Sequence, residues 1–225
     1  MVGNWHDRRA ALTLAAALAL GTAAHAATIT VAVVDREGKP VPEAVVVLSP
    51  SAGGQPRTPL PGHALVVQQK MQFLPAVTLL PAGGRVMFVN EDSWEHHVRG
   101  TAAGIAELNA APAHKGFELR LDGKSAGKEA KTAEVTLDRA GAMLLGCHLH
   151  GSMRGHIYVA DSPWAAKTSP DGQAVFDDVP AGAVRVRVWH AEQLIDLPVQ
   201  TASPAEAAPA RLNFQLQVVP RRRRT

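Results

Sequence analysis

The stretch Leu145–Ala160, LGCHLHGSMRGHIYVA, decides how the rest of the chain is interpreted. It contains Cys147, the only cysteine of the chain, followed at even intervals by His150 and Met153 in the pattern C-x2-H-x2-M. A thiolate, an imidazole and a thioether on one short loop form a soft ligand set, which suits copper better than other common metals. The stretch therefore predicts a copper site that needs one more imidazole from elsewhere in the chain.

The second imidazole is expected from Asn90–Val98, NEDSWEHHV. The run Arg85–Asn90 has the alternation of a strand, and the loop after it leads to His96 and His97 at the start of the next strand. Adjacent side chains of a strand point to opposite faces, so these two histidines cannot both bind one ion without a bulge. Only one of them is expected to be a ligand, and the strand pattern does not decide which.

Two of the three candidate ligands in the cysteine loop have a structural alternative. Cys147 could be a buried free thiol and Met153 could fill a gap in the core, because both residue types commonly do so. In an oxidising compartment a single cysteine cannot form an internal disulfide, so it is a free thiol, an intermolecular bridge or a ligand. His148 alternates away from Cys147 and is expected to be exposed or packed outside the site.

Composition and pattern indicate an all-β protein. Aromatic residues make up 4% of the chain, glycine and proline number 19 and 16, and valine recurs in alternating runs, which favours short strands over helices. The formal net charge is +3, and Arg221–Arg224 alone carry four positive charges. The basic character therefore belongs to a disordered tail, residues 220–225, and nucleic acid is not expected as a partner of an exported chain.

Residues 1–26 have the features of a cleaved signal peptide. Arg8 and Arg9 precede the apolar run Ala10–Leu20, which is too short to span a bilayer, and Ala24-His25-Ala26 is a small-x-small cleavage site. The mature protein is therefore expected in the periplasm, without a transmembrane segment. Retention of the apolar run as an anchor is the alternative.

The segment VAVVDREGKPVPEAVVVL, Val31–Leu48, and the segment Lys167–His190 come from opposite ends of the chain. Both resemble parts of carboxypeptidase regulatory-like domains, which are small prealbumin-type β-sandwiches. The first, residues 27–50, is expected to be a hairpin around the turn residues Asp35–Pro40. The second begins with Lys167–His190, and a last strand is expected within Leu212–Val219. Residues 27–50 are too few to bury a core alone, so together with residues 164–219 they are expected to form one split sandwich. The alternative is two unrelated β segments that flank one enlarged barrel.

The middle segment, residues 64–161, resembles the cupredoxins of the amicyanin and plastocyanin type. That family carries N-x5-H-N-V upstream, and C-x2-H with a nearby methionine before the final strand. The segments Met71–Val98 and Gly146–Val159 follow this pattern, with histidine in place of the asparagine after the first ligand. The resemblance implies a Greek-key β-sandwich or barrel with one mononuclear copper ion.

The resemblance also assigns the residues of the site. The copper ligands that the resemblance predicts are His96, Cys147, His150 and Met153. The resemblance places Asn90 and His97 beside the ligands, and Asn90 is expected to tie the upstream loop to the cysteine loop. More residues separate His96 from Cys147 than a compact cupredoxin needs. This longer connection removes none of the expected ligands.

The function implied by the resemblance is that of a periplasmic type 1, or blue, copper protein that carries one electron. Its redox partner is expected to be a dehydrogenase or a cytochrome, and the electron is expected to leave through His150. No coordination position remains open for a substrate, so enzymatic activity is not expected. A wider resemblance is to exported bacterial proteins called methylamine utilization proteins. Two other hypotheses stay open, namely periplasmic copper binding and delivery, and a metal-free interaction module.

Overall fold

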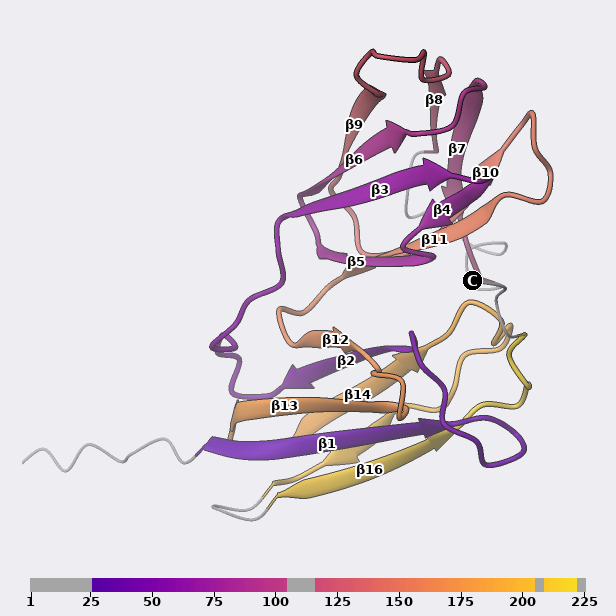
Figure 1. Cartoon of the computed structure of the whole chain (residues 1–225). Coiled ribbons are helices and arrows are strands. Elements are labelled where there is room, and N and C mark those ends of the chain that lie inside the picture. The colour runs from indigo at the N-terminus through magenta and orange to yellow at the C-terminus, as the bar shows by residue number, and fades with distance from the viewer. Residues whose placement is uncertain (1–25, 105–115, 205–208, 222–225) are drawn as a thin grey trace, which may run out of the picture.

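The computed structural model describes residues 26–104, 116–204 and 209–221, and within them every regular element is a β-strand. The strands form four sheets that stack as two β-sandwiches, one above the other in Figure 1. The all-β prediction is therefore confirmed. No helix among these residues is long and apolar enough to cross a membrane. The predicted signal peptide, apart from Ala26, and residues 222–225 of the predicted tail lie outside the described residues.

The upper sandwich is formed by the middle of the chain. One of its sheets has the order β4-β3-β6-β9, and the other has the order β5-β11-β10-β7-β8. Inward-facing side chains alternate along most of these strands and form one apolar core. The strands are β3 (His63–Gln69), β4 (Gln72–Leu74), β5 (Val77–Pro81), β6 (Gly84–Asn90), β7 (His96–Ala102), β8 (Phe117–Leu121), β9 (Lys131–Leu137), β10 (Gly141–Cys147) and β11 (Arg154–Ala160).

The lower sandwich is built from both ends of the chain. Its sheets have the orders β13-β1-β16 and β12-β2-β14-β15, and β16 pairs in parallel with β1. This pairing is the arrangement expected of a sandwich that is assembled from both chain ends. The limits of the split sandwich, residues 27–50 and 164–219, stay predictions. The strands are β1 (Ala26–Val34), β2 (Val45–Pro50), β12 (Ala165–Lys167), β13 (Gln173–Pro180), β14 (Val184–Trp189), β15 (Gln200–Ala202) and β16 (Ala210–Gln215).

The predicted hairpin of residues 27–50 is wrong. β1 pairs with β13 and β16, whereas β2 pairs with β12 and β14, so the two strands lie in opposite sheets of the lower sandwich. Burial gives the physical reason. Val46 and Leu48 of β2 enter the core of this sandwich, and Val45 and Val47 face the upper sandwich. A strand covered on both faces must lie in an inner layer, whereas β1 is half-exposed at alternate positions and forms an outer layer.

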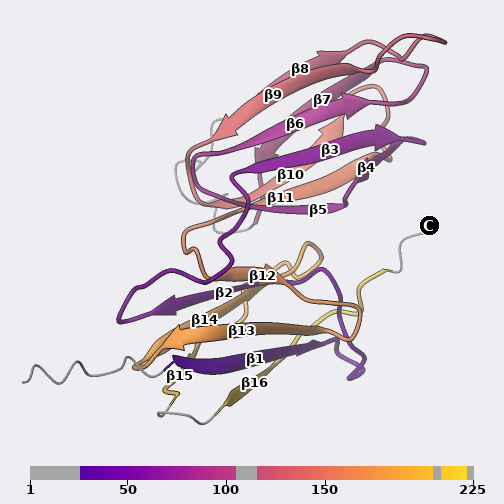
Figure 2. The ribbon, with the colours of Figure 1, turned by 60° about the vertical axis from the view of Figure 1, so that its left-hand side comes forward.

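A separate apolar cluster joins the two sandwiches. In it Val45 and Val47 of β2 meet Val77 of β5 and Tyr158 of β11. The ring of Trp189, at the end of β14, lies with its centroid 5.3 Å from that of Tyr158. The sheet that contains β10 and β11 is therefore covered on both faces along this seam. The ends of its strands stay free to carry loops, as Figure 2 shows.

Gly123, in the connection between β8 and β9, offers a test of this packing. A Cβ atom at Gly123 would lie 2.2 Å from the carbonyl oxygen of Ser93, in the loop between β6 and β7. Because the opposing atom belongs to the backbone, we expect Gly123→Ala to lower the free energy of unfolding by about 1–3 kcal/mol. Gly62→Ala is the matched control, since a Cβ there would meet nothing within 4 Å. Urea unfolding measures both variants, and equal midpoints would contradict the close approach.

Candidate metal centre

Three loops converge at one end of the upper sandwich. They are the β3–β4 turn, the β6–β7 loop and the β10–β11 loop, which lie together at the right of Figure 2. β6 and β7 belong to different sheets, so their connecting loop crosses the end of the sandwich. β7 then runs antiparallel to β10, with Val98 opposite Cys147. This register brings the first residue of β7, His96, next to the last residue of β10.

His96, Cys147 and His150 form a compact group, called the ligand cluster below. Their ligand atoms all lie within 4.8 Å of one another. His96 Nδ1 is 3.1 Å from His150 Nδ1 and 3.7 Å from Cys147 Sγ, and His150 Nδ1 is 3.5 Å from the same sulfur. His96 and Cys147 are buried, whereas His150 is half-buried. Two imidazoles and a thiol therefore face one point.

The spacing of the ligand cluster fits a first-row transition metal. Such ions bind histidine nitrogen at about 2.0–2.1 Å and thiolate sulfur at about 2.3 Å, which puts the ligand atoms of a trigonal or tetrahedral site about 3–4 Å apart. The three separations in the ligand cluster, 3.1, 3.5 and 3.7 Å, fall within this range. One thiolate and two imidazoles are also compatible in chemistry with copper.

Met153 lies on the same loop as His150. Its side chain is buried, and it belongs to the same apolar core as Cys147. The Met153 N–H donates to the His150 carbonyl at 2.9 Å, which closes a tight turn after the ligand. Met153 is therefore buried in the core beneath the loop, and its role as a fourth ligand stays a prediction.

A carboxylate that the sequence analysis did not single out holds His96. Asp92 is 6% exposed, and its Oδ2 atom lies 2.9 Å from His96 Nε2. The Nε2 atom is therefore taken by the carboxylate, and Nδ1 is the ring nitrogen that faces Cys147. A carboxylate on the outer nitrogen is a common way to fix the tautomer and orientation of a metal-binding histidine. In the sequence, the only indication of this role is that Asp92 is an acidic residue in the loop that leads to His96.

Asp92 is itself held by the β3–β4 turn. Its carboxylate accepts the N–H groups of Lys70 at 2.6 Å and of Met71 at 3.0 Å. Both turn residues have positive φ, 51° and 57°, which non-glycine residues seldom adopt. Burial by itself would raise the pKa of Asp92, but the hydrogen bonds from His96, Met71 and Lys70 outweigh burial and lower this pKa. The turn therefore supports a carboxylate that is ionised at neutral pH.

Asn90 lies at the end of β6, next to the loop that carries Asp92. Its side-chain oxygen accepts the Asp92 N–H at 3.0 Å. Its side-chain nitrogen donates at 2.9–3.1 Å to the carbonyl oxygens of Trp94, Leu121 and Asp122. These bonds join the β6–β7 loop to the end of β8 instead of the cysteine loop. The prediction that Asn90 ties the upstream loop to the cysteine loop is therefore wrong. The reason is that β6, the strand of Asn90, belongs to the sheet opposite β10.

His97 makes the link that was expected of Asn90. Its backbone N–H donates to Cys147 Sγ at 3.4 Å, and its carbonyl accepts the His148 N–H at 3.0 Å. The His97 ring is half-buried and lies on the face of β7 opposite to His96. His97 therefore stands beside the ligand cluster through its backbone, while its imidazole points elsewhere.

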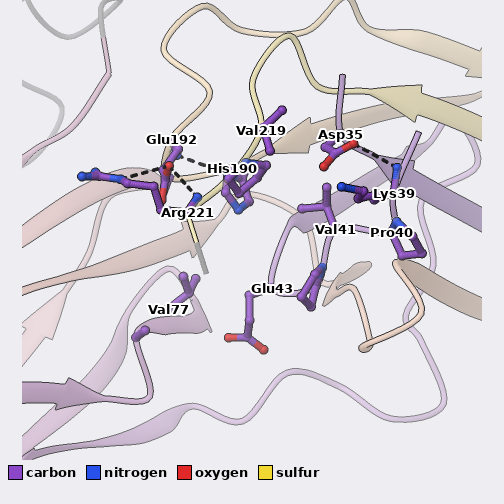
Figure 3. A pocket seen from close by; sticks show the side chains of 14 residues that line it. Asp35, Lys39, Pro40, Val41, Glu43, Val77, His190, Glu192, Val219 and Arg221 are labelled. Carbon is purple, nitrogen blue, oxygen red and sulfur yellow. Dashed lines mark hydrogen bonds and ion pairs between the residues drawn. The ribbon is translucent and has the colours of Figure 1, made fainter. Parts of the chain in front are cut away.

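A cavity of about 600 Å³ lies at the seam between the two sandwiches. Figure 3 shows Val77 of the upper sandwich and Glu192 of the lower one on its wall. Several polar groups of the wall bind one another. Glu192 accepts the Arg221 N–H at 3.1 Å, and Asp35 accepts the Lys39 N–H at 2.9 Å. The ligand cluster lies outside this cavity, so the two features are separate.

No protein-family model matches the chain, and no curated protein matches it. Solved structures do match. A purple cupredoxin from Nitrosopumilus maritimus is 16% identical over 43% of this chain and 99% of that chain, with a TM-score of 0.33. An amicyanin from Paracoccus versutus is 22% identical over 50% of this chain and 97% of that chain, with a TM-score of 0.32.

A copper-containing nitrite reductase from Thermus scotoductus also matches, with 23% identity and a TM-score of 0.34. The match covers 50% of this chain but only 25% of the nitrite reductase, so this chain spans about a quarter of that protein. These neighbours are similar to about half of this chain. The predicted cupredoxin fold is confirmed by a two-sheet sandwich that carries a His-Cys-His group at one end.

Asp92→Ala tests whether the carboxylate positions His96. Without Asp92, the His96 ring loses the partner that fixes its tautomer, and we expect the affinity for Cu(I) to fall about 10- to 100-fold. Competition with a chromophoric Cu(I) chelator measures this affinity. Asp122→Ala is the control, because it removes a nearby exposed carboxylate and keeps the backbone carbonyl that Asn90 binds. Equal losses in both variants would mean that Asp92 acts through its charge alone.

Proposed function

We propose that this protein is a periplasmic type 1 copper protein that carries single electrons. The observation that supports the proposal is the convergence of ligand atoms from His96, Cys147 and His150. A thiolate and two imidazoles with a weak axial thioether are the ligand set of blue-copper electron-transfer sites. One bound copper ion would supply reversible one-electron chemistry. The periplasmic part of the proposal rests on the signal-peptide pattern of residues 1–26.

The residues around the ligand cluster are suited to this role because they hold the ligands in place. His96 is fixed through Asp92, and Cys147 Sγ accepts the backbone N–H of His97. Both His96 and Cys147 also lie at the ends of paired strands. Ligands that are positioned in advance move little when the charge at the site changes by one electron. A hydrogen bond to the cysteine sulfur also tunes the reduction potential.

We propose no enzymatic role for the site. Catalytic metal sites keep a coordination position open for water or substrate. Here three ligands converge, and Met153 is buried in the adjoining core as the candidate for a fourth. With His96 and Cys147 buried, only His150 reaches toward solvent. This arrangement favours electron transfer through one ligand over binding of a substrate.

The surface near His150 is suited to a protein partner. Leu149 precedes it on the same loop and is exposed. Trp94, in the β6–β7 loop, and Met71, in the β3–β4 turn, are exposed apolar side chains on the neighbouring loops at this end. Large exposed apolar side chains that gather in one region are typical of a surface that another molecule covers. We propose that a periplasmic dehydrogenase or cytochrome docks here.

Cys147→Ser tests the electron-carrier proposal directly. We expect the copper-loaded protein to show an intense blue thiolate-to-copper absorption band, and the substitution to abolish it because the thiolate is lost. Visible and paramagnetic resonance spectra measure this, with Ser152→Ala, an exposed change in the same loop, as the control. Colourless Cu(I) that exchanges readily would favour copper delivery instead. Protein that binds no copper would favour a metal-free interaction module.

Met153→Leu tests the fourth ligand while nearly conserving the volume of the side chain. Loss of the axial donor would leave three ligands, a coordination number that suits Cu(I) better than Cu(II), so the reduction potential should rise. Each tenfold change in the ratio of the affinities for Cu(I) and Cu(II) shifts the potential by about 59 mV. Voltammetry measures the potential, with Met87→Leu on the exposed face of β6 as the control. An unchanged potential would assign Met153 to core packing.

A further inference from the structure

The outer face of the cluster-bearing sheet carries two more histidines. His97 follows His96 and His148 follows Cys147, so their side chains point to the face opposite to the ligands. The pairing of β7 with β10 continues through the bond from the His148 N–H to the His97 carbonyl at 3.0 Å. The two residues therefore lie across from each other. Side chains paired in this way have Cβ atoms about 4.5–5.5 Å apart.

The rings of this outer pair are arranged much like those of the ligand cluster. The ring centroids of His97 and His148 are 5.7 Å apart with an interplanar angle of 63°, and those of His96 and His150 are 4.9 Å apart at 69°. An ion bound at about 2.0–2.1 Å lies about 3.2 Å from the centroid of its ring, so two rings on one ion are about 4.5–5.5 Å apart. At 5.7 Å the outer rings stand just outside this range, so they must move closer together to bind one ion.

A carboxylate stands beside the outer pair. Glu118 Oε1 lies 3.4 Å from His148 Nε2, and the side chains of these two residues are 63% and 40% exposed. Two arginines are cross-strand neighbours of these groups, because Arg99 lies opposite Glu118 and Arg120 lies opposite His97. The Arg120 guanidinium is paired with Glu95 at 2.7 Å. Two imidazoles and a carboxylate are ligands that suit Zn²⁺ and Cu²⁺.

We propose that His97, His148 and Glu118 form a second metal site, on the surface, for a divalent ion such as Zn²⁺ or Cu²⁺. It differs from the ligand cluster in chemistry, because it offers nitrogen and oxygen but no sulfur. Among the described residues only the ligand cluster has three such groups already within 4.8 Å of one another. The outer site therefore closes when the solvent-exposed Glu118 and His148 side chains turn toward the ion. It binds reversibly, with water in the remaining positions.

Zinc titration of the untagged protein tests the second site, with Zn²⁺ alone as the probe. We expect the wild type to bind one more equivalent of zinc than His148→Gln and His97→Gln, or to bind that equivalent at least tenfold more tightly. Both variants keep the ligand cluster, so the difference reports the outer site whatever the cluster itself binds. A failure of the copper proposal would leave this result unchanged. The same zinc stoichiometry and affinity in all three proteins would overturn the second site.

A control and a second measurement make the test specific. His63→Gln removes another exposed strand histidine, which lies beside Arg85, and should bind zinc as the wild type does. In the wild type, zinc should shift the ring nuclear magnetic resonance signals of His97 and His148 and leave those of His63 in place. Zinc-dependent shifts that spare His97 and His148 would overturn the proposal, even if a second equivalent of zinc binds.

Discussion

The antiparallel register of β7 with β10 is the constraint on which the candidate metal centre depends. The first ligand and the cysteine come from strands far apart in the sequence, and only this register sets them side by side, with Val98 opposite Cys147. Side chains alternate across a strand, so a slip of one residue would exchange the inward and outward sets. His97 would then face the core, and one strand would present the wrong side chain to the other. The pairing of β7 with β10 thus decides that His96, and not His97, faces Cys147.

The rest of the fold explains why this register is stable. β10 lies within a five-stranded sheet between β11 and β7, and one face of that sheet contributes to the core of the upper sandwich. Its other face meets β2 and Trp189 of the lower sandwich through Ala142 and Tyr158. A slip would move buried apolar side chains to the wrong face of the sheet, at a cost that grows with the apolar area exposed. The lower sandwich therefore helps to hold the strands that carry His96 and Cys147 in register.

The parts of this structure that could be predicted from sequence are those encoded locally. Alternating apolar residues indicate most strands of the upper sandwich, and the C-x2-H spacing puts Cys147 and His150 on one loop. The hairpin of residues 27–50 could not be inferred reliably, because two neighbouring apolar strands pack across a core as readily as they pair edge to edge. The continuous apolar run of β2 was a signal of burial on both faces. Asp92 was missed because its role depends on N–H groups from the β3–β4 turn.

The two faces of the β7–β10 pair differ in burial as well as in the type of side chain that they offer to a metal ion. On the inner face, Asp92 is held as a carboxylate by backbone N–H groups, one imidazole away from where a copper ion would bind. Its negative charge adds to that of the Cys147 thiolate, and both act through a medium of low dielectric, where water screens them little. With copper bound as proposed, the two charges together would favour the more highly charged, oxidised state of the ion. On the outer face, Glu118 is exposed, so its charge is largely screened. Alternation thus turns His96 toward the buried Asp92 carboxylate of the β6–β7 loop, and His148 toward the exposed Glu118 carboxylate of β8.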